Sequence, residues 1–179
     1  MPATAPTDAR STPPARPTDV SLPLRGAMVA SGGALGLLSL LALVRAATGI
    51  APSAPAAHDA AVAVHLMSVL PAVPLGLYIL LMRKGGARHR VLGRIWMALM
   101  ASTAISAFFI RVLNQGSLSW IHIFIPVTLL AGWFAIAAAR AGDIPRHRRR
   151  LVGMFLGAMV IPGLFAFSPG RVMAIWAFG

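Results

Sequence analysis

RKGGARHRVLGR, residues 83–94, separates two long apolar runs and carries five Lys or Arg side chains. Charge at this density can neither be buried in a soluble core nor enter lipid, so the stretch is expected at a membrane surface. RAGDIPRHRRR, residues 140–150, also carries five Lys or Arg and follows two apolar runs later. We refer to residues 83–94 and 140–150 as the first and second basic hinge, and we expect both on the same side of the membrane.

Five apolar runs surround these hinges, at residues 26–46, 61–82, 93–113, 118–139 and 151–168. A helix needs about 20 residues to cross the hydrocarbon core, with a range of about 17 to 25. Backbone polar groups in lipid must be paired within the segment, and no run alternates like a strand of a membrane barrel. The sequence therefore predicts an all-α fold, a polytopic transmembrane helical bundle with five spans.

The composition agrees with a bilayer as the solvent. Hydrophobic residues make up 58% of the 179 residues and charged residues 11%, against about 45–50% and about 25% in soluble domains. The net charge of +12 would suggest a nucleic-acid partner, but the charges cluster at span ends, so we expect no nucleic acid. The chain has no cysteine, which excludes disulfides, thiolate metal sites and cysteine catalysis.

The positive-inside rule gives an orientation. With the amino terminus inside, the inner segments hold thirteen Lys or Arg, whereas the outer segments hold only Arg45, Arg111 and Arg171. Residues 1–25, rich in Pro, Thr, Ala and Ser, are predicted to be a disordered cytoplasmic tail. Residues 169–179 are predicted to be a short outer interfacial tail. Whether the first span is cleaved as a signal stays open.

Two histidines lie inside the predicted spans. His65 and His122 are each four residues from the outer end of their span, about 6 Å below the boundary. An ionisable side chain in a span is a functional candidate. The two could be axial ligands of a b-type haem, with Arg45 and Arg111 pairing with its propionates.

Two other interpretations of these histidines stay open. A quinone head group could bond to one of them, or a divalent metal could replace the haem. Alternatively, each ring bonds only to a carbonyl, to Ser68 or to Ser119, with no ligand. A catalytic set is not expected, because none of the four carboxylates lies in the middle of a span.

The hinges carry a second group of candidates for contact with an anion or a partner. This group comprises His89, Arg90, Arg94, Asp143, His147 and Arg148, together with Arg88 and Arg146. The basic side chains could bind anionic lipid head groups, a phosphate or the acidic loop of another membrane subunit. The single acid, Asp143, is expected to order its hinge as a helix cap or through a salt bridge.

The pattern of His65, HRxxGR at residues 89–94 and GDIxxHRR at residues 142–149 resembles a family of bacterial predicted membrane proteins, domain of unknown function 2306. The likeness covers about residues 60–168. It implies a multi-pass bundle in the bacterial inner membrane and no particular activity. It singles out His65, His89, Arg94, Asp143 and His147, whereas His122 matches the pattern less securely.

The sequence thus supports two hypotheses about function. The first is a non-enzymatic accessory or interaction subunit whose basic hinges contact lipid head groups or another membrane subunit. The second is a haem- or quinone-binding redox protein that uses His65 and His122.

Overall fold

Long apolar helices form the bundle in the computed structural model, which describes residues 20–111 and 117–179. They are α1 (Leu22–Ala47), α2 (Ala60–Leu81), α3 (Ala87–Phe109) and α4 (Phe124–Arg140), with short 3₁₀ turns η1 (Pro55–His58) before α2 and η3 (Trp120–Ile123) before α4. Each of the four, with η3 counted into the last, is long and apolar enough to cross a membrane. The chain is therefore an all-α, multi-pass membrane protein.

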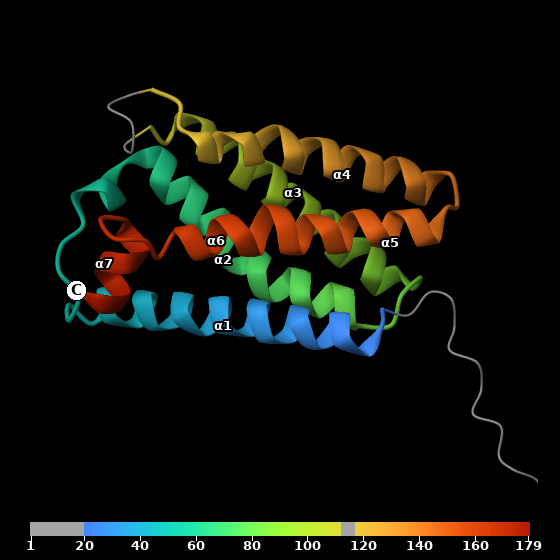
Figure 1. Cartoon of the computed structure of the whole chain (residues 1–179), viewed down its shortest axis with the longest axis horizontal. Coiled ribbons are helices and arrows are strands. Elements are labelled where there is room, and N and C mark those ends of the chain that lie inside the picture. The colour runs from blue at the N-terminus through green and yellow to red at the C-terminus, as the bar shows by residue number, and fades with distance from the viewer. Residues whose placement is uncertain (1–19, 112–116) are drawn as a thin grey trace, which may run out of the picture.

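The fifth apolar run lies in a succession of three helical segments that begins earlier than the predicted residue 151, within the second basic hinge. These are α5 (Ile144–Gly153), the π-helical η4 (Met154–Val160) and α6 (Ile161–Phe165), which form one continuous rod (Figure 1). Pro162 lacks the N–H that an α-helix would pair with the carbonyl of Ala158, and the ladder widens to π just before it. No single segment of the rod has the length of a span.

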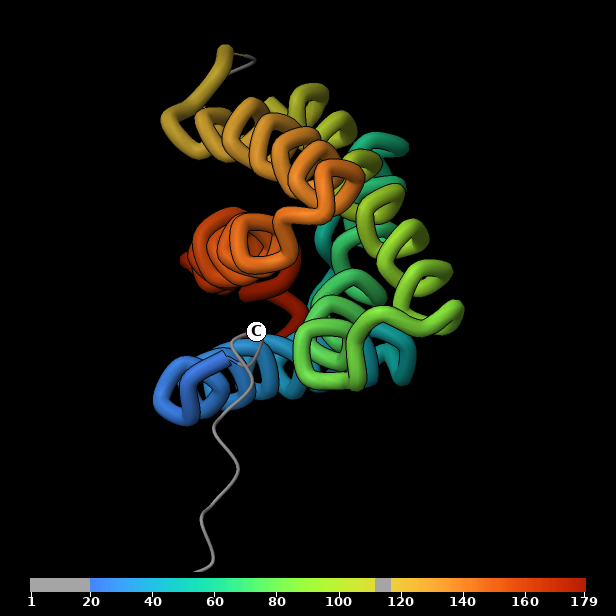
Figure 2. The backbone as a smooth tube through the Cα atoms, turned by 90° about the vertical axis from the view of Figure 1, so that its right-hand side faces the viewer, coloured from blue at the N-terminus to red at the C-terminus, as the bar shows by residue number. Residues whose placement is uncertain are grey.

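The rod lies on the inner side of an arc formed by the other helices. Seen end-on, α1, α2, α3 and α4 follow one another around this arc (Figure 2). The phenyl ring of Phe155, in the middle of the rod, is fully buried and packs so closely on Gly32 of α1 that an added Cβ there would lie 2.8 Å from it. The rod is therefore the centre of the core.

The C-terminal residues fold back on the bundle. Helix α7 (Val172–Phe178) packs against α1, where Met173 and Ala177 cluster with Ala42. The Nε–H of Arg45 donates to the carbonyl of Trp176 at 3.0 Å, and a second guanidinium nitrogen donates to the carbonyl of Gly179. The segment predicted as an interfacial tail is thus a helix packed on α1.

Both basic hinges lie at one end of the bundle. The α2–α3 and α4–α5 connections are at the right of Figure 1, where α1 also begins, and α2 and the η3–α4 segment begin at the opposite end. Helix α3 begins at Ala87, within the first hinge and earlier than the predicted residue 93, because basic side chains can continue a helix beyond the lipid boundary. Helix α1 begins at Leu22, with Pro23 in its first turn. Residues 1–19 of the predicted cytoplasmic tail lie outside the described residues.

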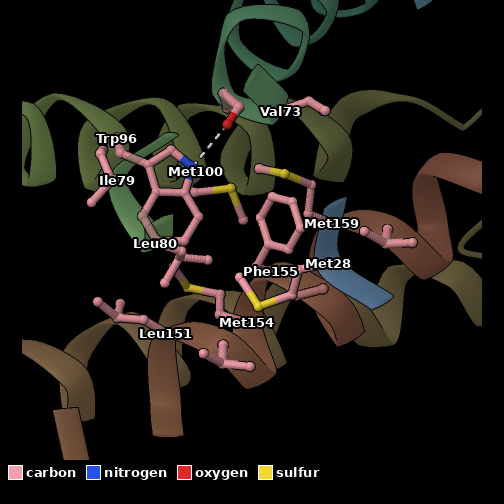
Figure 3. Close-up of a cluster of buried hydrophobic side chains, with 14 of the residues drawn as sticks. Met28, Val73, Ile79, Leu80, Trp96, Met100, Leu151, Met154, Phe155 and Met159 are labelled. Carbon is pink, nitrogen blue, oxygen red and sulfur yellow. Dashed lines mark hydrogen bonds between the residues drawn. The ribbon is translucent and has the colours of Figure 1, made fainter. Parts of the chain in front are cut away.

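The closest helix contact joins α2 and α3. The indole of Trp96, 1% exposed, covers Gly76 and donates its N–H to the carbonyl of Ala72 at 2.9 Å (Figure 3). A Cβ on Gly76 would lie 2.5 Å from the indole nitrogen. Methionines fill the space around the rings of Trp96 and Phe155 (Figure 3), and Met28 and Met100 are almost fully buried.

We predict that Gly76→Ala destabilises the fold. The new methyl group would overlap the Trp96 ring and force α2 and α3 apart. Overpacking of a core costs about 1–3 kcal/mol, so the detergent-purified variant should lose its monodisperse elution peak at a lower temperature than the parent.

Gly93→Ala is the matched control, because Gly93 also lies within a helix and a Cβ there would meet nothing within 4 Å. It should leave the melting temperature unchanged or raise it, since alanine favours helix by about 1 kcal/mol over glycine. Equal melting temperatures of the Gly76→Ala and Gly93→Ala variants would contradict the role assigned to the Gly76–Trp96 contact.

Candidate ligand cavity

A cavity of about 180 Å³ lies inside the bundle, lined by all of its long helices and by the segment that joins α6 to α7. Most lining residues are apolar. The polar ones come from different elements: Ser39, His65, Thr103, His122, Thr128 and Arg171. The fold therefore brings the two candidate histidines, 57 residues apart in the chain, to one cavity.

The contacts of His65 fix its tautomer. Its Nδ1 lies 3.0 Å from the carbonyl oxygen of Thr103 and 3.2 Å from the hydroxyl of Ser106, both on α3. A carbonyl oxygen only accepts, so Nδ1 carries the proton and donates it. The Nε2 of the neutral ring is then a lone-pair acceptor, the form in which histidine binds a metal or accepts a ligand's proton.

The contacts of His122 allow the opposite tautomer. This residue lies in the 3₁₀ turn η3, where the backbone N–H of Ser119 donates to its Nδ1 at 3.0 Å as part of a capping box. The carbonyl oxygen of Ser119 also lies 3.0 Å from Nδ1. In the tautomer in which Nδ1 accepts the amide proton, Nε2 carries a proton and can donate it. This Nε2 is buried and has no partner among the described residues.

Two further polar groups border the cavity. The hydroxyl of Thr103 is buried and has no hydrogen-bond partner within the described part of the chain. An unpaired buried hydroxyl is costly, which suggests that something else satisfies it. Arg171 follows α6 and is partly buried. Burial lowers the pKa of its guanidinium from the ordinary value, yet arginine remains protonated in proteins, so the group adds a positive charge at the cavity.

The volume of the cavity and the polar groups that line it limit the ligands that could bind there. An apolar cavity of about 150 Å³ holds a benzene molecule, so a cavity of about 180 Å³ suits one or two fused rings rather than the four pyrroles of haem. A bis-histidine haem would also need a lone pair on both Nε2 atoms, which His122 lacks when its Nδ1 accepts the Ser119 amide proton. In the described residues no group of three or more His, Cys, Asp or Glu could hold a metal ion.

The two arginines predicted to pair with the haem propionates lie away from the cavity. Arg45 holds α7, and the guanidinium of Arg111 lies over the ring of Phe108 at 5.0 Å. Neither lines the cavity, whereas Arg171 does. Sequence reasoning missed Arg171 and Thr103 as cavity residues. The one available signal for Thr103 was a hydroxyl near the outer end of a span, at a depth similar to that of His65.

Several hinge candidates make local hydrogen bonds. Asp143 caps α5 by accepting the N–H of Arg146 at 3.0 Å, one of its two predicted roles. Arg90 donates to the carbonyl of Gly85 at 2.9 Å, and the Nδ1 of His147 lies 2.8 Å from the carbonyl of Ala135.

Among the other hinge candidates, the guanidinium of Arg88 lies over the ring of Tyr78, 5.5 Å from its centre. Arg94 is exposed, Arg148 is partly buried, and the buried Nδ1 of His89 has no partner among the described residues.

No family model, curated protein or solved structure matches this chain. The family resemblance carried by residues 89–94 and 142–149 stays a prediction. Any functional conclusion must therefore be drawn from the geometry of the cavity and of the surface.

We predict that Thr103→Val raises the melting temperature of the ligand-free protein. Valine has nearly the shape of threonine and removes a hydroxyl that has no partner, which should gain about 1 kcal/mol. Thermal unfolding of the detergent-purified variant, followed by circular dichroism, measures the change.

Thr128→Val is the comparison, because the hydroxyl of Thr128 donates to the carbonyl of Phe124 at 2.6 Å. Both residues line the cavity, but only this second substitution removes a formed hydrogen bond. A fall in melting temperature for Thr103→Val as large as that for Thr128→Val would show that the Thr103 hydroxyl is paired.

Proposed function

We propose that this membrane protein binds the ring of a lipid-soluble quinone in the cavity between His65 and His122. The observation that carries the proposal is that two histidines line one mainly apolar cavity, His65 with its Nδ1 at a carbonyl acceptor and His122 with its Nδ1 at an amide donor. Binding sites for small molecules are typically apolar cavities with a few polar groups that orient the ligand.

The polar groups match both redox forms of such a ring. The Nε2–H of His122 can donate to a quinone carbonyl oxygen, which only accepts. The Nε2 of His65 can accept the hydroxyl proton of the reduced quinol. Thr103 can donate or accept, so its hydroxyl would find in either form the partner that the described residues do not provide.

The hypotheses of a haem, a metal ion and an accessory subunit differ in how well they fit the cavity. A b-type haem is disfavoured by the size of the cavity, and the proposed tautomer of His122 leaves no lone pair on its Nε2. A bound metal ion would need more ligands than the described residues offer there. The role of an accessory or interaction subunit stays a prediction, and it is compatible with quinone binding.

We predict that the purified protein binds a short-chain benzoquinone or naphthoquinone, and that His122→Phe weakens binding about 10- to 100-fold. This is the range expected for the loss of one buried hydrogen bond worth about 1–3 kcal/mol. His65→Phe should weaken binding of the quinol more than that of the quinone, because the lost group is an acceptor. Isothermal titration calorimetry in detergent with each redox form measures the affinities.

His58→Phe is the matched control, since this exposed histidine lies in η1 and does not line the cavity. It should bind as the parent does. Absence of quinone binding by a well-folded parent would refute the proposal. So would a Soret band in the spectrum of protein expressed with ample haem, if His65→Phe and His122→Phe both removed it.

We further propose that the rod of α5, η4 and α6 is a fifth span and that the hinges face the cytoplasm at a bacterial inner membrane. The support is the strong bias of Lys and Arg toward the hinge end of the bundle.

Single cysteines test this orientation without background, because the chain has none. In intact cells Ser53→Cys, near the cavity end, should react with an impermeant maleimide, and Gly86→Cys in the first hinge should react only after lysis. Both residues are exposed. The reverse pattern would invert the topology.

A further inference from the structure

A second concave surface lies between α4 and the α5–η4 segment. This groove, of about 710 Å³, is lined at one end by Asp143, Arg146, Arg149 and Arg150, and further along by Val127, Ala131, Gly153 and Met154. It shares no lining residue with the cavity that holds the two histidines. The groove is therefore a separate candidate site.

The basic end of the groove has an excess of positive charge. Arg146 and Arg149 are exposed, and their guanidinium groups have no ion pair in the described part of the chain. Arg150 extends over the ring of Phe134, 5.3 Å from its centre. The carboxylate of Asp143 is engaged in capping α5. Three guanidinium groups thus face one carboxylate, which favours an anion with several acceptor oxygens, such as a phosphate.

The other end of the groove is apolar and open. A Cβ on Gly153 would meet nothing within 4 Å, and Val127 on the facing helix is 45% exposed. From Arg146 to Met154 the helix rises about 12 Å, close to the depth of one leaflet, about 15 Å of hydrocarbon. The groove therefore changes from basic to apolar over the distance along which a phospholipid changes from head group to acyl chain.

We propose that this groove binds one anionic phospholipid, with its phosphate against Arg146, Arg149 and Arg150 and an acyl chain beside Gly153. Basic surfaces that adjoin transmembrane helices bind anionic head groups in this way. The glycine leaves the space that the chain occupies, and the arginines distinguish an anionic head group from a zwitterionic one.

Native mass spectrometry of the full-length protein tests the proposal. The probes are phosphatidylglycerol, phosphatidylcholine with the same acyl chains, and inorganic phosphate. We expect at least a tenfold preference for phosphatidylglycerol over phosphatidylcholine. The combined variant Arg146→Gln, Arg149→Gln and Arg150→Gln should abolish this preference.

The matched control is Arg25→Gln, Arg83→Gln and Lys84→Gln, which removes the same charge from exposed positions at the same end of the bundle. It should keep the preference. An equal loss in both triple variants would overturn the proposal, because it would show attraction by diffuse charge instead of a site.

Gly153→Leu separates a lipid from a free phosphate. The leucine would fill the apolar end of the groove and leave all three arginines in place, so phosphatidylglycerol binding should fall about tenfold. Unchanged binding in this variant would overturn the placement of the acyl chain. Inorganic phosphate that displaced the lipid at equal concentration would overturn the lipid as the ligand and leave a site for a soluble anion.

Discussion

The contact between α2 and α3 is the interaction on which the rest of the bundle depends. Lipid offers no hydrophobic gain for helix association, so close packing and polar contacts must hold the helices together. Along this interface the Trp96 indole covers Gly76, the hydroxyls of Ser68 and Ser102 lie 2.7 Å apart, and the ring of His65 bonds to the α3 backbone. Large and small side chains thus alternate with polar pairs along one antiparallel crossing.

This interface also decides the chemistry of the cavity. Because α3 supplies a carbonyl acceptor to Nδ1 of His65, the opposite nitrogen of the ring is an acceptor. The turn before α4 supplies an amide donor to Nδ1 of His122, and in the proposed tautomer the opposite nitrogen is a donor. Two identical residue types therefore offer complementary groups, and the backbone around each ring makes the difference.

The two ends of the bundle differ in the polarity and charge of the side chains that line their concave surfaces. One end holds a mainly apolar cavity with a few polar groups, which suits a neutral ring. The other holds the basic hinges and an open groove, which suits an amphipathic anion. The rod through α5, η4 and α6 contributes to both, since Gly153 and Met154 line the groove and Pro162 lines the cavity. The described residues thus hold two separate concave surfaces within one helical bundle.

The sequence by itself determined the all-α class, the approximate positions of the helices and the shared end of the two hinges, because hydropathy and charge act locally against a solvent of fixed thickness. It also selected His65 and His122. Only the tertiary structure decided that these rings line one cavity, that Arg171 borders it while Arg45 holds α7, and that Nδ1 of His65 donates its proton to α3. Apolar periodicity does not specify which helices are neighbours in lipid, and a tautomer depends on backbone groups that only packing brings within hydrogen-bonding distance.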